Sequence, residues 1–130
     1  MKKFYMTTVT AVLALIFVFA GQIQSYAATY GYTEIKGTNN YSYTVAVEAN
    51  RTGHYVAYSV WTKNDINVKW WIKDLDTGVT VKTGKITSTG FNGGKVTGLY
   101  GKRYRLYLKC DDYSWNNNKC NSYGIISTYQ

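Results

Sequence analysis

The chain has 130 residues, with 15 basic and 7 acidic side chains that give a formal net charge of +8 at pH 7. This length suits one small domain and excludes an assembly of several domains. The positive charge favours polyanionic partners, such as wall polymers, acidic glycans, anionic lipid headgroups or nucleic acid, although it serves solubility equally well.

The first 27 residues have the pattern of a cleaved export signal. Two lysines follow the initial Met, and residues 9–20 form an apolar segment interrupted by a single threonine. This segment is too short to span a bilayer, which needs about 20 residues. Residues 25–27 (Ser-Tyr-Ala) match a small-x-small cleavage site. We therefore expect a signal peptide over residues 1–27 and a secreted mature domain over residues 28–130.

The mature part is predicted to consist of short β-strands. It contains no proline and no segment of helical periodicity, and its turns are rich in Gly, Asn and Asp. Because parallel strands need long crossover connections, which the sequence lacks, the sheets should be mainly antiparallel. About eight strands are expected. They cover residues 30–35, 41–48, 54–61, 66–74, 79–82 and 123–129, with a weaker strand at 86–91, a flexible turn at 92–94, and a turn leading into a strand at 98–110.

Alternation of apolar and polar residues assigns two faces to the strand at the end of residues 98–110. One face should pack on the core and the other should contact water. The core face carries Tyr104, Leu106 and Leu108, and the solvent face carries Arg105, Tyr107 and Lys109.

Residues 66–74 also alternate, and they contain two adjacent tryptophans. If this strand has a solvent face, one of the two rings must point outward. Trp70 resembles the core tryptophan that sandwich domains carry on a central strand, which leaves Trp71 exposed. In residues 41–48, the same rule places four residues on one face: Tyr41, Tyr43, Val45 and Val47.

The spacing of Leu99, Gly101 and Tyr104 resembles the tyrosine corner of Greek-key β-sandwiches, as in immunoglobulin-like and fibronectin-like domains. In those domains the tyrosine hydroxyl bonds to backbone a few residues upstream and fixes the crossover between the sheets. The resemblance implies an all-β, antiparallel Greek-key sandwich. It implies nothing about activity.

Cys110 and Cys120 are the only cysteines of the chain. Export favours oxidation, so we expect one disulfide between them. A metal pair is the alternative, but no histidine or second cysteine pair stands nearby to complete four ligands. Asp74 and Asp76 resemble half of a calcium loop, although a hairpin turn explains both residues. No metal or other cofactor is expected.

Catalysis fits the sequence poorly. His54 is the only histidine, and it stands beside a glycine in a turn, where histidine is usually an ordinary surface residue. The sequence contains no nucleophile elbow, no HExxH motif and no phosphate-binding loop. We therefore predict no catalytic residues.

Aromatic and basic residues are the best candidates for binding. Rings beside Asn, Asp and Lys are typical of sugar binding, whereas a cationic face suits an anionic polymer or a membrane interface. The alternative is purely structural, because tyrosine is a good strand former and lysine protects sheet edges from aggregation. The candidate ligand-binding residues are Trp71, Arg105, Tyr107, Lys109 and Trp115.

Together these features predict a secreted, non-enzymatic domain that binds a carbohydrate or an anionic polymer at or outside the cell envelope. A secreted antimicrobial or toxin-like effector is the first alternative, because small size, positive charge and many rings also suit that role. An inhibitor of an extracellular enzyme is the second. Export argues against nucleic acid as the partner, and no transmembrane segment is expected after signal cleavage.

Overall fold

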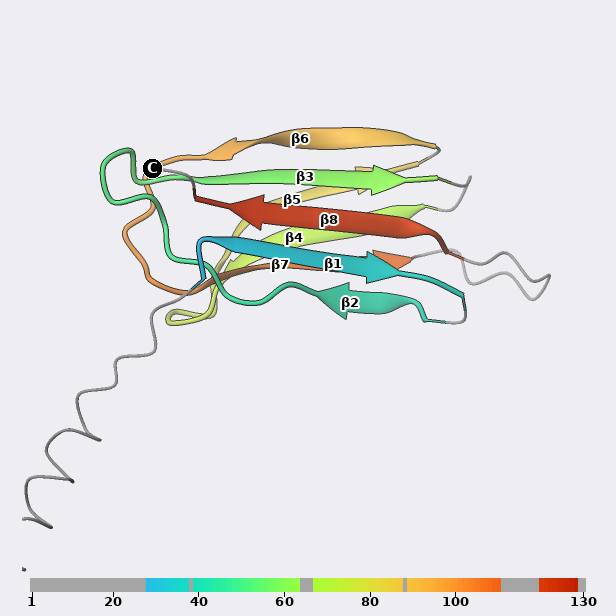
Figure 1. Cartoon of the computed structure of the whole chain (residues 1–130), viewed down its shortest axis with the longest axis horizontal. Coiled ribbons are helices and arrows are strands. Elements are labelled where there is room, and N and C mark those ends of the chain that lie inside the picture. The colour runs from blue at the N-terminus through green and yellow to red at the C-terminus, as the bar shows by residue number, and fades with distance from the viewer. Residues whose placement is uncertain (1–27, 38, 64–66, 88, 111–119, 129–130) are drawn as a thin grey trace, which may run out of the picture.

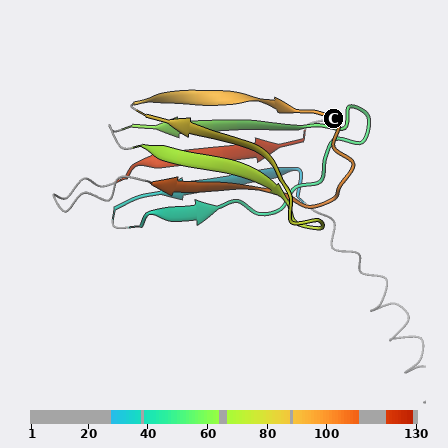
Figure 2. The same cartoon turned by 180° about the vertical axis from the view of Figure 1, so that it is seen from behind.

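The computed structural model describes residues 28–37, 39–63, 67–87, 89–110 and 120–128, so the predicted export signal lies outside the described residues. The described residues form two four-stranded sheets that stack face to face, as the opposite views of Figures 1 and 2 show. The strands are β1 (Tyr30–Ile35), β2 (Tyr41–Tyr43), β3 (Val56–Thr62), β4 (Val68–Asp74), β5 (Thr80–Ile86), β6 (Gly90–Val96), β7 (Tyr104–Cys110) and β8 (Ser122–Ser127).

The two sheets have the strand orders β1-β8-β3-β6 and β2-β7-β4-β5. All neighbouring strands are antiparallel. The chain passes to the opposite sheet at every connection between strands except the β4–β5 hairpin. This architecture confirms the predicted antiparallel β-sandwich. Within the described part of the chain, no helix is long and apolar enough to cross a membrane.

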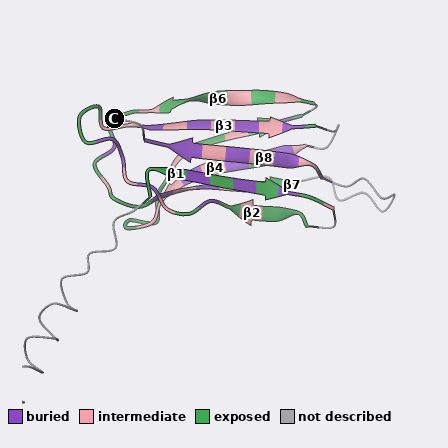
Figure 3. Cartoon of the chain, viewed as in Figure 1, coloured by how far each residue is buried: buried purple, intermediate pink, exposed green. Residues whose placement is uncertain are grey.

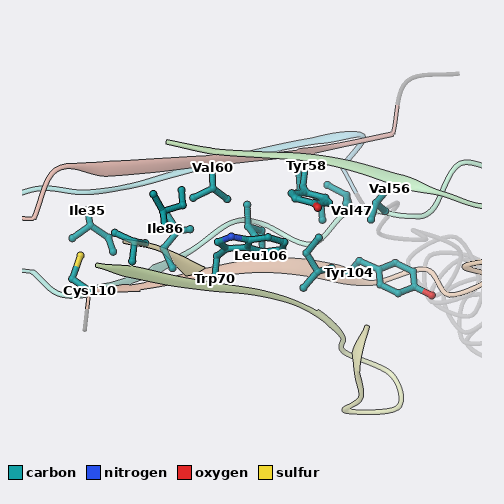
Figure 4. Packing of buried hydrophobic residues seen from close by; sticks show 14 of the residues in the cluster. Ile35, Val47, Val56, Tyr58, Val60, Trp70, Ile86, Tyr104, Leu106 and Cys110 are labelled. Atoms are coloured by element: carbon teal, nitrogen blue, oxygen red, sulfur yellow. The ribbon is translucent and has the colours of Figure 1, made fainter. Parts of the chain in front are cut away.

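Apolar side chains fill the space between the sheets, because inward-pointing apolar residues alternate along the strands with outward-pointing residues. Strands β3, β4 and β7 bury every second residue along most of their length, and Figure 3 shows this banding on β3. Trp70 occupies the middle of the core and is 1% exposed, with its ring centroid 4.6 Å from that of Tyr58 (Figure 4). Gly84, opposite Trp70 on β5, leaves room for the indole, since a Cβ there would overlap the ring. The prediction of Trp70 as the core tryptophan is confirmed.

The tyrosine corner is present at the start of β7. Tyr104 is buried, and its hydroxyl accepts a hydrogen bond of 2.9 Å from the backbone amide of Gly101. Burial raises the pKa of Tyr104, and the bond from Gly101 opposes this shift. Leu99 is buried as well. The corner thus anchors the connection from β6, in one sheet, to β7 in the other.

The predicted disulfide joins Cys110 to Cys120, with the two Cα atoms 6.4 Å apart. Cys110 ends β7, and Cys120 lies shortly before β8. Because β7 and β8 belong to different sheets, the disulfide links the two layers of the sandwich at one end.

The strand predicted over residues 41–48 is shorter than expected, because β2 ends at residue 43. Beyond it, the side chain of Thr44 takes the place of a backbone carbonyl and accepts the amide hydrogen of Leu106 at 3.1 Å. Regular alternation is lost at this point. Val45 and the two tyrosines of β2 are exposed, whereas Val47 is fully buried. The prediction that all four share one face is therefore wrong for Val47.

The flexible turn predicted at residues 92–94 is also wrong, because these residues lie inside β6. The chain turns between β5 and β6, so the predicted strand over residues 86–91 does not exist as one element. Gly93 instead leaves space for the ring of Phe91. A Cβ at this position would lie 2.5 Å from Cζ of Phe91, whose ring occupies the position that a side chain would take.

Candidate binding surface

The outer face of the β2-β7-β4-β5 sheet carries rings in its centre and cations on both sides. Cross-strand register aligns Tyr43, Tyr107 and Trp71 in one row. In the neighbouring rows on either side, the same register aligns cationic side chains across the strands. We call this surface the basic-aromatic face. It consists of the rings of Tyr41, Tyr43, Trp71 and Tyr107 and the cations of Lys69, Lys73, Lys85, Arg105 and Lys109.

The rings of this face contact one another. Trp71 and Tyr107 are parallel, with an interplanar angle of 1° and centroids 5.3 Å apart, which is an offset stack. The ring centroid of Tyr43 lies 5.7 Å from that of Tyr107. The ring centroid of Tyr41 lies 6.3 Å from those of both Trp71 and Tyr107. Tyr41 is 45% exposed and Tyr43 is 50% exposed. These neighbouring strands therefore present a continuous aromatic surface to solvent.

Arg105 is positioned by a ring of the same face. Its guanidinium Cζ lies 4.7 Å from the ring centroid of Tyr43, which is a cation–π contact. The Nε atom is buried and has no hydrogen-bond partner among the described atoms. Ring contact on one side keeps the charge of Arg105 at the edge of the aromatic row.

Within the described ranges, the acidic residues lie away from the basic-aromatic face. The acidic residues within the described ranges have partners elsewhere: Glu34 with Lys36, Glu48 with Arg51, Asp74 with the amides of its own turn, and Asp76 with Arg103. A group of lysine and arginine side chains on one sheet face favours anionic ligands.

Tyr41 adds a neutral ring to this positive surface. Burial raises the pKa of Tyr41, the neighbouring hydroxyls of Tyr107 and Tyr43 raise it further, and the positive charge of Arg105 lowers it. The net shift is upward. The Tyr41 hydroxyl therefore stays neutral at pH 7 and adds no negative charge to the face.

Four of the five candidate ligand-binding residues lie together on this face. Trp71, on β4, stacks on Tyr107, on β7, and Arg105 and Lys109 are on the same side of β7. The predicted outward orientation of Trp71 and Tyr107 is confirmed. Trp115 lies outside the described residues. A role of these residues in binding stays a prediction.

Sequence reasoning missed Tyr41 and Tyr43 as members of the face. Their alternation was visible in the sequence, but the pairing of β2 with β7 was not, because these strands are far apart along the chain. The same holds for Lys85, which reaches the face through the pairing of β5 with β4. Lys69 and Lys73 could have been included from their alternation with Trp71.

His54 is not part of the basic-aromatic face. It lies in a loop in the left-handed backbone region, with φ of 49°, and its amide donates to the Asn50 carbonyl at 2.7 Å. Its ring packs on Tyr100 with centroids 4.2 Å apart. Across the described ranges, no group of three or more His, Cys, Asp or Glu residues could hold a metal.

Two solved structures share this fold, and a third is less similar. No protein-family model matches the sequence, and no curated protein matches it either. The pre-peptidase C-terminal domain of collagenase from Bacillus anthracis is 15% identical with a TM-score of 0.53, over 78% of this chain and 90% of that domain. PirA is 6% identical with a TM-score of 0.50, over 83% and 100% of the two chains. The K1 cleaved adhesin domain of Lys-gingipain from Porphyromonas gingivalis is 11% identical with a TM-score of 0.45, over 76% and 73%. At these identities the likeness concerns the fold alone.

Proposed function

We propose that the protein is an exported binding domain whose basic-aromatic face binds an anionic polysaccharide at or outside the cell envelope. The proposal rests on one observation, which is the row of Tyr43, Tyr107 and Trp71 between two rows of cations. Sugar rings pack their apolar C–H faces on aromatic rings, and acid groups form charge-assisted bonds with Lys and Arg. A polymer that has both sugar rings and acid groups contacts both the rings and the cations of the face.

The spacing of a β-sheet gives this face a suitable shape. Neighbouring strands are about 4.8 Å apart, so three rings on adjacent strands form a row of roughly 10 Å. Outward residues on one strand are about 7 Å apart, so the cations lie about 7 Å to either side of the row. A polysaccharide lying along the rings therefore has lysine or arginine beside both of its edges.

The two parts of the face should respond differently to salt. Attraction between cations and a polyanion weakens as salt screens the charges and as the gain from counterion release falls. Packing of sugar on rings persists at high salt. Truncation of a central ring at an interface costs about 2 kcal/mol, or roughly 30-fold in affinity.

The test measures binding of protein purified from culture supernatant to polygalacturonate and to isolated cell wall, at low and high salt. Fully methyl-esterified polygalacturonate keeps the sugar rings and removes the charge, and polyphosphate keeps the charge and removes the rings. We expect the tightest binding to polygalacturonate, with a decrease at high salt. Trp71→Ala should weaken this binding at both salt concentrations.

Alanine variants show which residues contribute to the affinity for polygalacturonate. Arg105→Ala with Lys109→Ala should weaken binding mainly at low salt, whereas Arg51→Ala with Lys102→Ala removes the same charge elsewhere and should have little effect. His54→Ala should bind like the parent. If the Trp71 variant and the Arg105/Lys109 variant both bind like the parent, the proposal is wrong. If His54→Ala alone abolishes function, an enzyme becomes the better interpretation.

A secreted effector remains the alternative function, and it makes a different prediction. Such a protein should inhibit the growth of neighbouring cells when it is added in purified form. Binding to wall material without growth inhibition supports a binding domain. Growth inhibition that Trp71→Ala does not reduce supports the effector.

A further inference from the structure

A second row of rings crosses the outer face of the other sheet, β1-β8-β3-β6, on the opposite side of the sandwich. Register places Phe91 of β6 and Tyr123 of β8 on either side of Trp61 of β3. The ring centroids of both lie 5.0 Å from that of Trp61. Tyr32 of β1 pairs with Ile125, one outward position further along β8, and its ring centroid lies diagonally 6.5 Å from that of Tyr123. We call Tyr32, Trp61, Phe91 and Tyr123 the opposite aromatic row.

This row is open to solvent and partly held in place. Phe91 is 59% exposed and Tyr32 is 48% exposed, so both ends of the row are accessible. The tip of the Phe91 ring lies over Gly93, at the position that a Cβ would occupy. Gly93 pairs with Ser59, so small residues border the row on that side. Ile125 of β8 pairs with Ser59 in the same register, so the side chains bordering the rings are small on β3 and β6.

The charge around the opposite aromatic row differs from that of the basic-aromatic face. Glu34 pairs with Lys36 at 2.9 Å and accepts a hydrogen bond of 2.9 Å from the Tyr32 hydroxyl. These two bonds lower the pKa of Glu34, so it stays ionised at neutral pH. Lys63 lies over the Tyr123 ring, 5.5 Å from its centroid. Acid and base thus stand together at one end of this row.

We infer that the opposite aromatic row is a second binding surface, and that its ligand is an uncharged polysaccharide. Four rings, one from each strand of the sheet, offer packing surface for successive sugar rings. Glu34, Lys36 and Lys63 give this end of the row a mixed charge, which attracts a polyanion less than the cations of the basic-aromatic face do, and the Glu34 carboxylate can accept hydrogen bonds from sugar hydroxyls. The aromatic packing and the charge both match a neutral glycan.

The position of the two surfaces gives the protein a further function. They lie on the outer faces of two stacked sheets, about 10 Å apart and pointing in opposite directions. One ligand cannot cover both. A single domain therefore links an anionic polysaccharide on one side to a neutral polysaccharide on the other, a cross-linking function that goes beyond the proposed binding to the first ligand.

The test uses an array of uncharged polysaccharides and oligosaccharides, with polygalacturonate as the anionic reference. We expect binding to at least one uncharged member, with little dependence on salt. Trp61→Ala should reduce this binding at least about tenfold and leave polygalacturonate binding unchanged, and Trp71→Ala should do the reverse. Phe91→Ala is a second variant at a highly exposed position, where loss of folding is not expected.

A separate bead-aggregation experiment measures cross-linking. Beads coated with polygalacturonate should aggregate with beads coated with the neutral glycan when the parent protein is added, and either tryptophan variant should abolish this aggregation. Binding to no uncharged member of the array would overturn the inference, as would loss of both ligands in Trp61→Ala. Concentration-dependent self-association that Phe91→Ala removes would show that a second copy of the chain covers the row instead. Binding to an uncharged polysaccharide, and its loss in Trp61→Ala, can be measured whether or not polygalacturonate binds, whereas cross-linking rests on the proposed function as well.

Discussion

The hydroxyl of Tyr104 accepts a hydrogen bond of 2.9 Å from the amide of Gly101, three residues upstream. Removal of this hydroxyl leaves the Gly101 amide without its acceptor, in a partly buried corner. We expect Tyr104→Phe to lower the free energy of unfolding by about 1–3 kcal/mol. Tyr107→Phe, which removes a hydroxyl from the outer face of the same strand, should change it little. Equal midpoints for both variants in denaturant unfolding would contradict a stabilising role for the corner.

The disulfide between Cys110 and Cys120 should contribute to stability. It links two residues that are 10 positions apart, and so it restricts the conformations of the unfolded chain between them. On the chain-entropy model, replacement of both cysteines by alanine lowers the free energy of unfolding by about 2–3 kcal/mol. Reductant should produce a similar decrease in the parent and none in the double variant. Free thiols in the natively secreted protein would contradict the assignment.

Gly84 should not tolerate a side chain, because the indole of Trp70 occupies the position of its Cβ. Gly84→Ala forces the ring to move within a closely packed core, and such overpacking costs about 1–3 kcal/mol. Lys82→Ala, at an exposed position of the same strand, serves as the control. Thermal unfolding of both variants tests this prediction, and an unchanged melting temperature for Gly84→Ala would show that the core adjusts without strain.

Binding of a polyanion to the basic-aromatic face should weaken at high pH, when Tyr41 ionises. Ionisation of Tyr41 would add a negative charge to the face and weaken the binding of a polyanion. The pKa of Tyr41 is raised by burial and by Tyr107 and Tyr43, so this loss is delayed to a pH above the ordinary tyrosine value of about 10. Ultraviolet titration of the parent against Tyr41→Phe measures the shift.

The mature protein should begin at Ala28, the residue directly after the predicted cleavage site. Ala28 forms a bridge with Val47, so this residue is paired from the start of the predicted mature chain. Mass spectrometry of protein from culture supernatant gives the N-terminal residue directly. Recovery of the chain with Met1 intact in a membrane fraction would contradict cleavage.

Local patterns predicted much of this fold. Alternation alone separates the buried Trp70 from the outward Trp71, since neighbouring residues of a strand face opposite sides. The spacing from Leu99 to Tyr104 was enough to predict a corner that the structure contains. Such signals work because they depend on residues that are close together in the sequence.

Features that depend on distant residues could not be predicted in this way. Gly93 indicates a turn when only its sequence neighbours are considered, yet its role is to leave space for Phe91 within a strand. The inward position of Val47 depends on the bond between Thr44 and Leu106, which no local pattern contains. The grouping of rings on both sheet faces depends likewise on strand pairing, which brings together residues from all parts of the chain.

The strand order also has a consequence for the timing of folding. Within its sheet, β1 pairs only with β8, so the first strand meets its partner only after the last strand has been synthesised. Contacts of such long sequence separation form slowly, because a large loop must close first. A chain still on the ribosome therefore cannot complete this sheet, and Cys110 cannot pair with Cys120 before that residue has emerged. The topology therefore delays completion of the fold, which agrees with the predicted export, since an export channel passes unfolded chains.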